Sequence, residues 1–129
     1  MEKILSMAER RLGERHLISF PIRVEWKDDK GEEVVEEGLT ENIGPSGILI
    51  HLPRLLPNVG SKVNVTVTEN PATTQVTVTA QVLRLERNAA HPQAALMLVG
   101  STKDWEKEVW QYAGDVLAAQ KPDNFDDWN

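Results

Sequence analysis

The sequence predicts a mainly β protein, a single antiparallel barrel of strands with a short N-terminal helix or arm and a C-terminal helix. Two observations predict this class. Apolar and polar residues alternate in segment after segment between residues 17 and 99, and the connections between these segments are short and carry no helical pattern. Parallel neighbours would need crossovers of about a dozen residues or more, so we expect antiparallel pairing. Closing the sheet into a barrel would remove its exposed edges.

Length and composition limit the alternatives. The chain has 129 residues, 40% of them hydrophobic, which is enough to bury one sizeable core. It contains no cysteine, which excludes disulfides and thiolate chemistry and agrees with a reducing cytoplasm. No apolar run approaches the roughly 18 residues that a membrane span needs. We therefore expect a cytoplasmic protein that does not insert into a membrane.

The predicted elements follow the change of hydrophobic period along the chain. Residues 1–16 form a short amphipathic helix or an arm, and residues 17–100 form the barrel. Alternation predicts strands over residues 17–26, 34–42, 47–52, 63–67, 75–87 and 94–99. Within the long fifth strand the alternation slips between Val82 and Leu83, which predicts a bulge or a bend.

The C-terminal part changes to a helical pattern. Residues 101–120 are predicted to form a helix covering a mouth or flank of the barrel, because apolar residues recur there at helical spacing. They are Trp105, Val109, Tyr112, Ala113, Val116 and Leu117. Residues 121–129, KPDNFDDWN, are expected to be a disordered acidic tail in which only Phe125 or Trp128 would dock.

No residue pattern argues for an enzyme, a metal or a cofactor. His16, His51 and His91 lie far apart in sequence, so structural or surface positions are the better interpretation. The serines lack a nucleophile-elbow context. The net charge of −6 also disfavours a nucleic-acid partner, since such proteins mostly gather Lys and Arg on one face.

Two motifs remain that could bind a ligand. Arg10, Arg11 and Arg15 lie within the run RRLGER, and guanidinium groups bind phosphate bidentately and stack on flat bases. Taken alone, two arginines at this spacing are better explained by an ordinary surface helix.

The second motif is NIGPSG, between the second and third predicted strands. The amide of Asn42 can offer a donor and an acceptor to a base edge, and Gly44 and Gly47 would allow positive φ or a close approach of ligand to backbone. A plain hairpin turn favours the same residue types.

Order and setting change this balance. A chain with R-x-x-x-R near its N-terminus, a first strand ending around RVEW, and then [D/N]-x-S-x-x-G before an apolar strand resembles the PilZ domain family. The resemblance covers residues 10–100 and implies a six-stranded antiparallel barrel that binds the bacterial second messenger cyclic di-GMP. It implies that Arg11 and Arg15, with the basic neighbour Arg10, hold phosphate and guanine, and that Asn42 and Gly47 are the ends of the second motif.

One position departs from the family pattern. The motif serine falls on Gly44, so a hydroxyl that would hydrogen-bond the ligand is missing, and Ser46 is two residues away. The loss of one ordinary hydrogen bond costs about 0.5–1.5 kcal/mol, which is roughly a tenfold weakening of binding.

The expected function is a cyclic di-GMP-binding signalling domain. The segment of residues 10–15 would fold over the ligand as phosphate neutralises its charge, rearrange the N-terminal segment and pass the signal to a protein partner. The alternative is a degenerate adaptor that does not bind the nucleotide and acts through protein contacts. A single-strand nucleic-acid barrel is a remote third option, because no aromatic stacking platform is evident.

Overall fold

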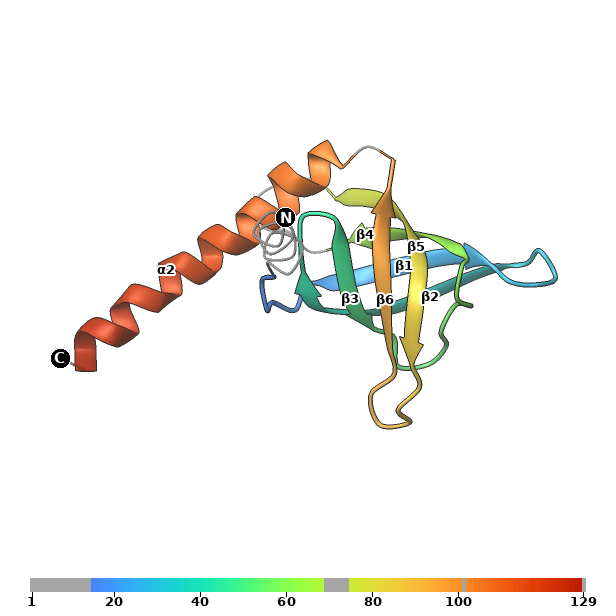
Figure 1. Ribbon diagram of the computed structural model, residues 1–129, viewed down its shortest axis with the longest axis horizontal. Helices are drawn as coiled ribbons and strands as arrows, with labels where there is room; N and C mark the ends of the chain where they lie inside the picture. The colour runs from blue at the N-terminus through green and yellow to red at the C-terminus, as the bar shows by residue number, and fades with distance from the viewer. Residues whose placement is uncertain (1–14, 69–74, 101, 129) are drawn as a thin grey trace, which may run out of the picture.

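The computed structural model describes residues 15–68, 75–100 and 102–128. In this part of the chain six antiparallel strands close into a barrel (Figure 1). The strands are β1 (Pro21–Lys27), β2 (Glu33–Ile43), β3 (Gly47–His51), β4 (Lys62–Val67), β5 (Val76–Glu86) and β6 (Gln93–Val99). Around the barrel they follow the order β1-β2-β3-β6-β5-β4, and pairing of β1 with β4 closes the ring. The predicted antiparallel barrel is confirmed, while the predicted N-terminal helix or arm, residues 1–16, lies outside the described residues except for Arg15 and His16.

Period-two alternation produces the core. Along β1, Ile22, Val24 and Trp26 are buried while the residues between them remain partly accessible. The same pattern in the other strands fills the interior with mostly β-branched side chains, which suit the pleated surface. The fully buried ones include Ile43, Ile48, Ile50, Val63, Val65, Val67 and Val82.

The alternation starts at residue 17, and the first strand itself begins at Pro21, a residue typical of the beginning of a strand. Phe20 donates its backbone N–H to the Thr40 hydroxyl at 2.8 Å, and Thr40 returns its own N–H to the Phe20 carbonyl at 3.0 Å. The hydroxyl of Thr40 thus accepts the hydrogen bond that a backbone carbonyl would accept in a regular ladder. Residues 16–20 therefore run beside β2 without being part of β1.

Two helical segments follow β6. A π-helical segment, η1 (Trp105–Trp110), leads into α2 (Gln111–Trp128). Trp105, Val109 and Ala113 are fully buried against the barrel. α2 continues past residue 120, where the predicted tail begins, and Figure 1 shows it leading away from the barrel. Among the described residues, no helix combines the length and hydropathy required to span a bilayer.

β6 runs from one end of the barrel to the other. Its first residue, Gln93, follows the β5–β6 turn, and its last, Val99, precedes η1. The β3–β4 loop lies at the same end of the barrel as the β5–β6 turn, since Leu52 donates its N–H to the carbonyl of Pro92 at 3.3 Å.

Candidate functional site

A row of four register partners crosses the outer face of the barrel. Asn42 on β2 pairs with Leu49 on β3, Leu49 pairs with Ala95 on β6, and Ala95 pairs with Arg84 on β5. These four residues, called the outer row below, help line a surface cavity of about 350 Å³. The two ends of the row are polar and its middle is apolar and low, because Ala95 carries only a methyl group.

A bulge in β2 turns Asn42 toward this cavity. The pairing passes from Thr40 opposite Ile50 directly to Asn42 opposite Leu49, which leaves Glu41 as the extra residue. A regular ladder would pair Asn42 with the buried Ile48 instead. Since one residue of register reverses the face of every side chain, the bulge places the amide of Asn42 outside the barrel.

A second bulge, in β5, has the same effect on Arg84. The pairing passes from Val82 opposite Leu96 to Arg84 opposite Ala95, with Leu83 as the extra residue. The bulge predicted from the slip at Val82 and Leu83 is confirmed. Arg84 was not singled out as a site residue, although the slip was the signal: the residue after it changes face.

Arg15 lies over the start of β3. A Cβ atom added to Gly47 would lie 3.4 Å from both Nη1 and Nη2 of Arg15, and 3.2 Å from the carbonyl oxygen of Leu96. Gly47 does not adopt positive φ, unlike Gly31, Gly60 and Gly100. The guanidinium group of Arg15 thus lies directly over Gly47 at ordinary van der Waals distance, and the tighter neighbour of such a Cβ atom is the Leu96 carbonyl. Arg15, itself exposed, lines the same cavity as Asn42 and Arg84.

The arm that carries Arg15 is hydrogen-bonded to β2 at two places. His16 and Ile43 exchange backbone hydrogen bonds of 2.8 and 2.9 Å. Further along, the buried hydroxyl of Thr40 donates to the carbonyl of Ile18 at 2.6 Å and accepts the N–H of Phe20. These bonds fix the backbone next to Arg15, while its side chain extends to the cavity.

Gly44 uses its backbone groups within the protein. Its N–H donates to the Gly47 carbonyl at 2.8 Å, and its carbonyl accepts the indole N–H of Trp105 at 2.9 Å. Ser46 is exposed and its carbonyl accepts the N–H of Leu98 at 3.0 Å. Neither Gly44 nor Ser46 lines the cavity. Of the predicted site residues, Arg15, Asn42 and Gly47 are thus brought together, whereas Gly44 lies behind them, buried. Arg10 and Arg11 lie outside the described residues.

The C-terminal helical segments contact the back of both motifs. His16 stacks on Trp110 with ring centroids 4.9 Å apart, and a Cβ atom added to Gly114 would lie 3.0 Å from His16 Nε2. Together with the Trp105 bond to Gly44, this joins the arm and the β2–β3 turn to one helical element.

Two of the three histidines lie together, contrary to the expectation from their spacing. The rings of His51 and His91 stack with centroids 4.0 Å apart, and His91 Nε2 contacts the carboxylate of Glu41. That hydrogen bond lowers the pKa of the Glu41 carboxyl below its ordinary value of 4.5; burial opposes the shift, and the amide of Gln93 supports it. The residues meet because β3 pairs with β6 and β2, an arrangement that their separation in sequence hides. Among the described residues, neither this group nor any other set of three or more His, Cys, Asp or Glu side chains is arranged so that it could hold a metal ion.

The cavity suits a flat ligand that carries negative charge. Its middle offers apolar surface from Leu49 and Ala95, Asn42 offers an amide, and Arg15 and Arg84 supply two guanidinium groups. Neither arginine has an ion-pair partner among the described residues. Guanidinium groups bind phosphate and stack on planar rings, so the arrangement favours a phosphorylated planar molecule over an extended peptide.

Fold and cavity define the class first: a closed six-stranded antiparallel barrel with a cationic arm over its outer face. The model of the PilZ domain family matches residues 9–112, which is well over half of the chain. The chain belongs to the PilZ domain family, as its motifs predicted.

Solved structures agree with this assignment. The inhibitor of motility from Bacillus subtilis (MotI/DgrA) superposes with a TM-score of 0.62 at 18% identity, over 83% of this chain and 51% of that one. MrkH from K. pneumonia, in complex with c-di-GMP, gives 0.61 at 10% identity, over 84% and 52%. The PilZ domain of YcgR from Escherichia coli, with c-di-GMP, gives 0.57 at 12% identity, over 86% and 94%.

The chain thus spans about half the length of the first two structures and nearly all of the third. At these identities the similarity establishes the fold alone. No curated protein sequence matches the chain.

Proposed function

We propose that this chain is a cyclic di-GMP-binding signalling domain of the bacterial cytoplasm. The observation that carries the proposal is the position of Arg15: its guanidinium nitrogens pack against Gly47 at the mouth of a cavity that Asn42 also lines. One residue of the R-x-x-x-R motif and both ends of the second motif thus converge on one surface. Family membership supports the ligand, since two related structures were solved as complexes with c-di-GMP.

In this proposal the arginines bind phosphate and guanine. Arg10, Arg11 and Arg15 repel one another until phosphate neutralises them, and charge-assisted hydrogen bonds then hold the segment over the ligand. Asn42 pairs with a guanine edge, and the low apolar surface at Ala95 accepts a base face. Arg84, at the far end of the outer row, adds a second cation to the same cavity.

The rearranged segment transmits binding through His16. Because His16 stacks on Trp110 and packs against Gly114, a movement of the arm changes the surface on which η1 and the start of α2 rest. A protein partner that contacts these helical segments would sense the ligand in this way. The proposal requires no catalytic step and no metal or cofactor besides the ligand.

The second candidate is a degenerate adaptor that has lost nucleotide binding. Gly44 favours it, because the motif serine is absent and both backbone groups of Gly44 are already hydrogen-bonded within the protein. In that case the Trp105 bond and the arm contacts are purely structural.

Calorimetric titration with cyclic di-GMP separates the two. The first candidate predicts saturable heat, and the double variant Arg11→Ala, Arg15→Ala should weaken binding by about a hundredfold or more, since each lost charge-assisted contact costs about 1.5–3 kcal/mol. The matched control is Arg23→Ala on β1, whose side chain lies 4.0 Å from Glu25 and is not among the residues that line the cavity.

A second variant tests the departure from the motif. Gly44 does not line the cavity itself, but its N–H bonds the Gly47 carbonyl beside Arg15. If the domain is a receptor, the hydroxyl added by Gly44→Ser should reach a ligand held there and tighten binding by up to about tenfold, whereas an adaptor should not change. Absence of heat at high ligand concentration, or equal affinities of the double variant and the wild type, would reject the receptor function.

A further inference from the structure

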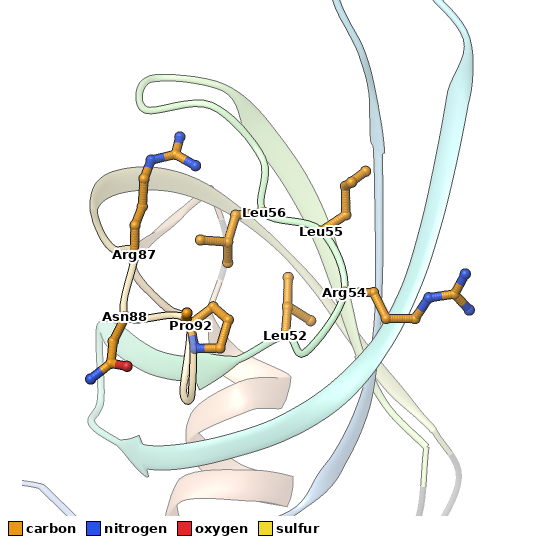
Figure 2. A pocket seen from close by; sticks show the side chains of 8 residues that line it. Leu52, Arg54, Leu55, Leu56, Arg87, Asn88 and Pro92 are labelled. Carbon is orange, nitrogen blue, oxygen red and sulfur yellow. The ribbon is translucent and has the colours of Figure 1, made fainter.

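A second hollow lies at the end of the barrel opposite η1. It is a cavity of about 280 Å³, called the Leu52 cavity below, formed where the β3–β4 loop meets the β5–β6 turn. Figure 2 shows Leu52, Leu56 and Pro92 facing its centre, with Arg54 and Arg87 on opposite sides. Leu52 is fully buried and forms the floor.

Two hydrogen bonds join the loops that form the cavity. The Pro92 carbonyl accepts the N–H of Leu52 at 3.3 Å and a hydrogen bond from His51 Nδ1 at 2.8 Å. A carbonyl can only accept, so His51 carries its proton on Nδ1 in this contact. The floor is therefore set before any occupant arrives.

The margin of the Leu52 cavity is cationic and apolar. Arg54 and Arg87 are exposed and form no ion pair with another described residue, although the chain as a whole carries a charge of −6. Leu55 beside them is 50% exposed. Unpaired guanidinium groups next to exposed leucine favour an occupant that combines carboxylates with a large apolar side chain.

The size of the cavity favours a side chain over a free small molecule. Pockets for small ligands span about 300–1,000 Å³. At about 280 Å³ the Leu52 cavity falls just below that range. One aromatic side chain of a peptide segment fits these dimensions, with its acidic neighbours at the arginines.

The chain itself contains a segment of this chemistry. Residues 121–129 have the sequence KPDNFDDWN, in which Asp126 and Asp127 stand between Phe125 and Trp128. α2 carries this segment away from its own barrel, and in Figure 1 the C-terminal end lies far from the β5–β6 turn. Because α2 leads this segment away from its own barrel, the segment is available to a second copy.

We propose that the acidic aromatic end of α2 docks in the Leu52 cavity of a second copy of this chain. Trp128 or Phe125 fills the apolar floor, and Asp126 and Asp127 pair with Arg54 and Arg87. The interface is head-to-tail: the tail of one chain occupies the cavity of the next. It is small and weak, below the size of a standard stable interface. This self-association is independent of nucleotide binding.

Sedimentation equilibrium of the full chain, from about 10 to about 500 μM, tests the proposal. The apparent mass should rise with concentration. Arg87→Glu and Trp128→Ala should each weaken the association by about tenfold or more. Arg23→Glu changes the net charge by the same amount at a distant site and should leave the association at its wild-type strength.

Mixing the two weakened variants gives the decisive result. The Arg87→Glu chain keeps an intact tail and the Trp128→Ala chain keeps an intact cavity, so the mixture should associate more strongly than either variant does alone. A further chain combines Arg87→Glu with Asp126→Lys and Asp127→Lys, which reverses the charge of the tail as well as that of the cavity. Its association should be stronger than that of Arg87→Glu alone. A monomeric mass throughout, an effect of Arg23→Glu equal to that of Arg87→Glu, or a mixture that stays monomeric would overturn the proposal.

Discussion

The cavity over the outer row, lined by Arg15 and Arg84, and the Leu52 cavity, lined by Arg54 and Arg87, both place two arginines beside apolar surface, yet they suit different occupants. In the outer row the apolar part is Leu49 and Ala95 on adjacent strands, which is broad and low. In the Leu52 cavity it is a buried leucine at the bottom of a smaller hollow between two loops. The comparison teaches that guanidinium groups select the charge of an occupant, while the surface between them selects its shape.

The two hollows also differ in what positions their arginines. Arg84 is placed by the register of β5 against β6, and the backbone next to Arg15 is hydrogen-bonded to β2. Arg54 and Arg87 stand on a loop and at a strand end. A planar ligand with fixed phosphates needs the first kind of support, whereas a flexible peptide tolerates the second.

Removing Trp105 should separate the two hollows with the largest effect. The side chain is fully buried, so Trp105→Ala should lower the free energy of unfolding by about 3–5 kcal/mol. It also removes the N–H that holds Gly44, so nucleotide affinity should fall in the folded fraction while self-association through the Leu52 cavity persists. Urea unfolding, with titrations well below the transition, measures both. Equal losses of nucleotide affinity and of self-association would contradict the prediction that Trp105 supports only the cavity over the outer row.

The arginines themselves provide a direct exchange test. Arg84→Ala should weaken cyclic di-GMP binding by about tenfold or more, because one charge-assisted contact is lost. Arg87→Ala, three residues further along the chain, should leave that affinity unchanged and weaken self-association instead. Isothermal titration and sedimentation of both variants check this pattern, and the reverse assignment of effects would show that the second bulge does not serve the ligand.

Thr40 tests whether the arm matters to the outer row from a distance. Thr40→Val preserves shape but leaves the N–H of Phe20 and the carbonyl of Ile18 without the hydroxyl, which should cost about 1–3 kcal/mol of stability. Because the arm carries Arg15, nucleotide affinity should also fall severalfold. Thr40→Ser keeps the hydroxyl and should retain the affinity, measured by the same titration. Wild-type affinity in Thr40→Val would mean that Arg15 needs no support from this contact.

The sequence predicts those parts of the site that depend on local pattern. Asn42 and Gly47 are recognisable from their spacing, and the slip at Val82 and Leu83 predicts the bulge in β5. The bulge at Glu41 leaves no such sign, since Thr40, Glu41 and Asn42 are all polar and show no break in alternation. Which face Asn42 occupies therefore depends on its pairing with β3.

Features that join non-consecutive strands are less accessible to sequence reasoning. Arg84 reaches the cavity because β5 pairs with β6 and β6 pairs with β3, and the strand order is not a local property. The same order brings His51 beside His91. The role of Gly47 is also tertiary: its backbone conformation is ordinary, and an added Cβ atom would be tight only against the Leu96 carbonyl of the neighbouring strand, at 3.2 Å.

Glu41, the extra residue of the β2 bulge, contacts His91 and should give the smallest effect. Its hydrogen bond with His91 depresses the pKa of the folded carboxyl, so the contact stabilises the protein above the ordinary value of 4.5 and is lost as pH falls through the lower folded value. Glu41→Gln should therefore lower the free energy of unfolding by less than about 1 kcal/mol near neutral pH, since the pair is partly exposed.

The difference between the two proteins should vanish as pH falls through the depressed pKa of Glu41, where the wild-type carboxyl is protonated and resembles the amide. Urea unfolding of wild type and Glu41→Gln across this range measures the difference. A gap that widens on acidification would have the wrong sign for a depressed carboxyl pKa. Glu41 is the extra residue of the β2 bulge. A matching small change in nucleotide affinity would therefore show that the contact between Glu41 and His91 helps to position the bulge and, with it, Asn42.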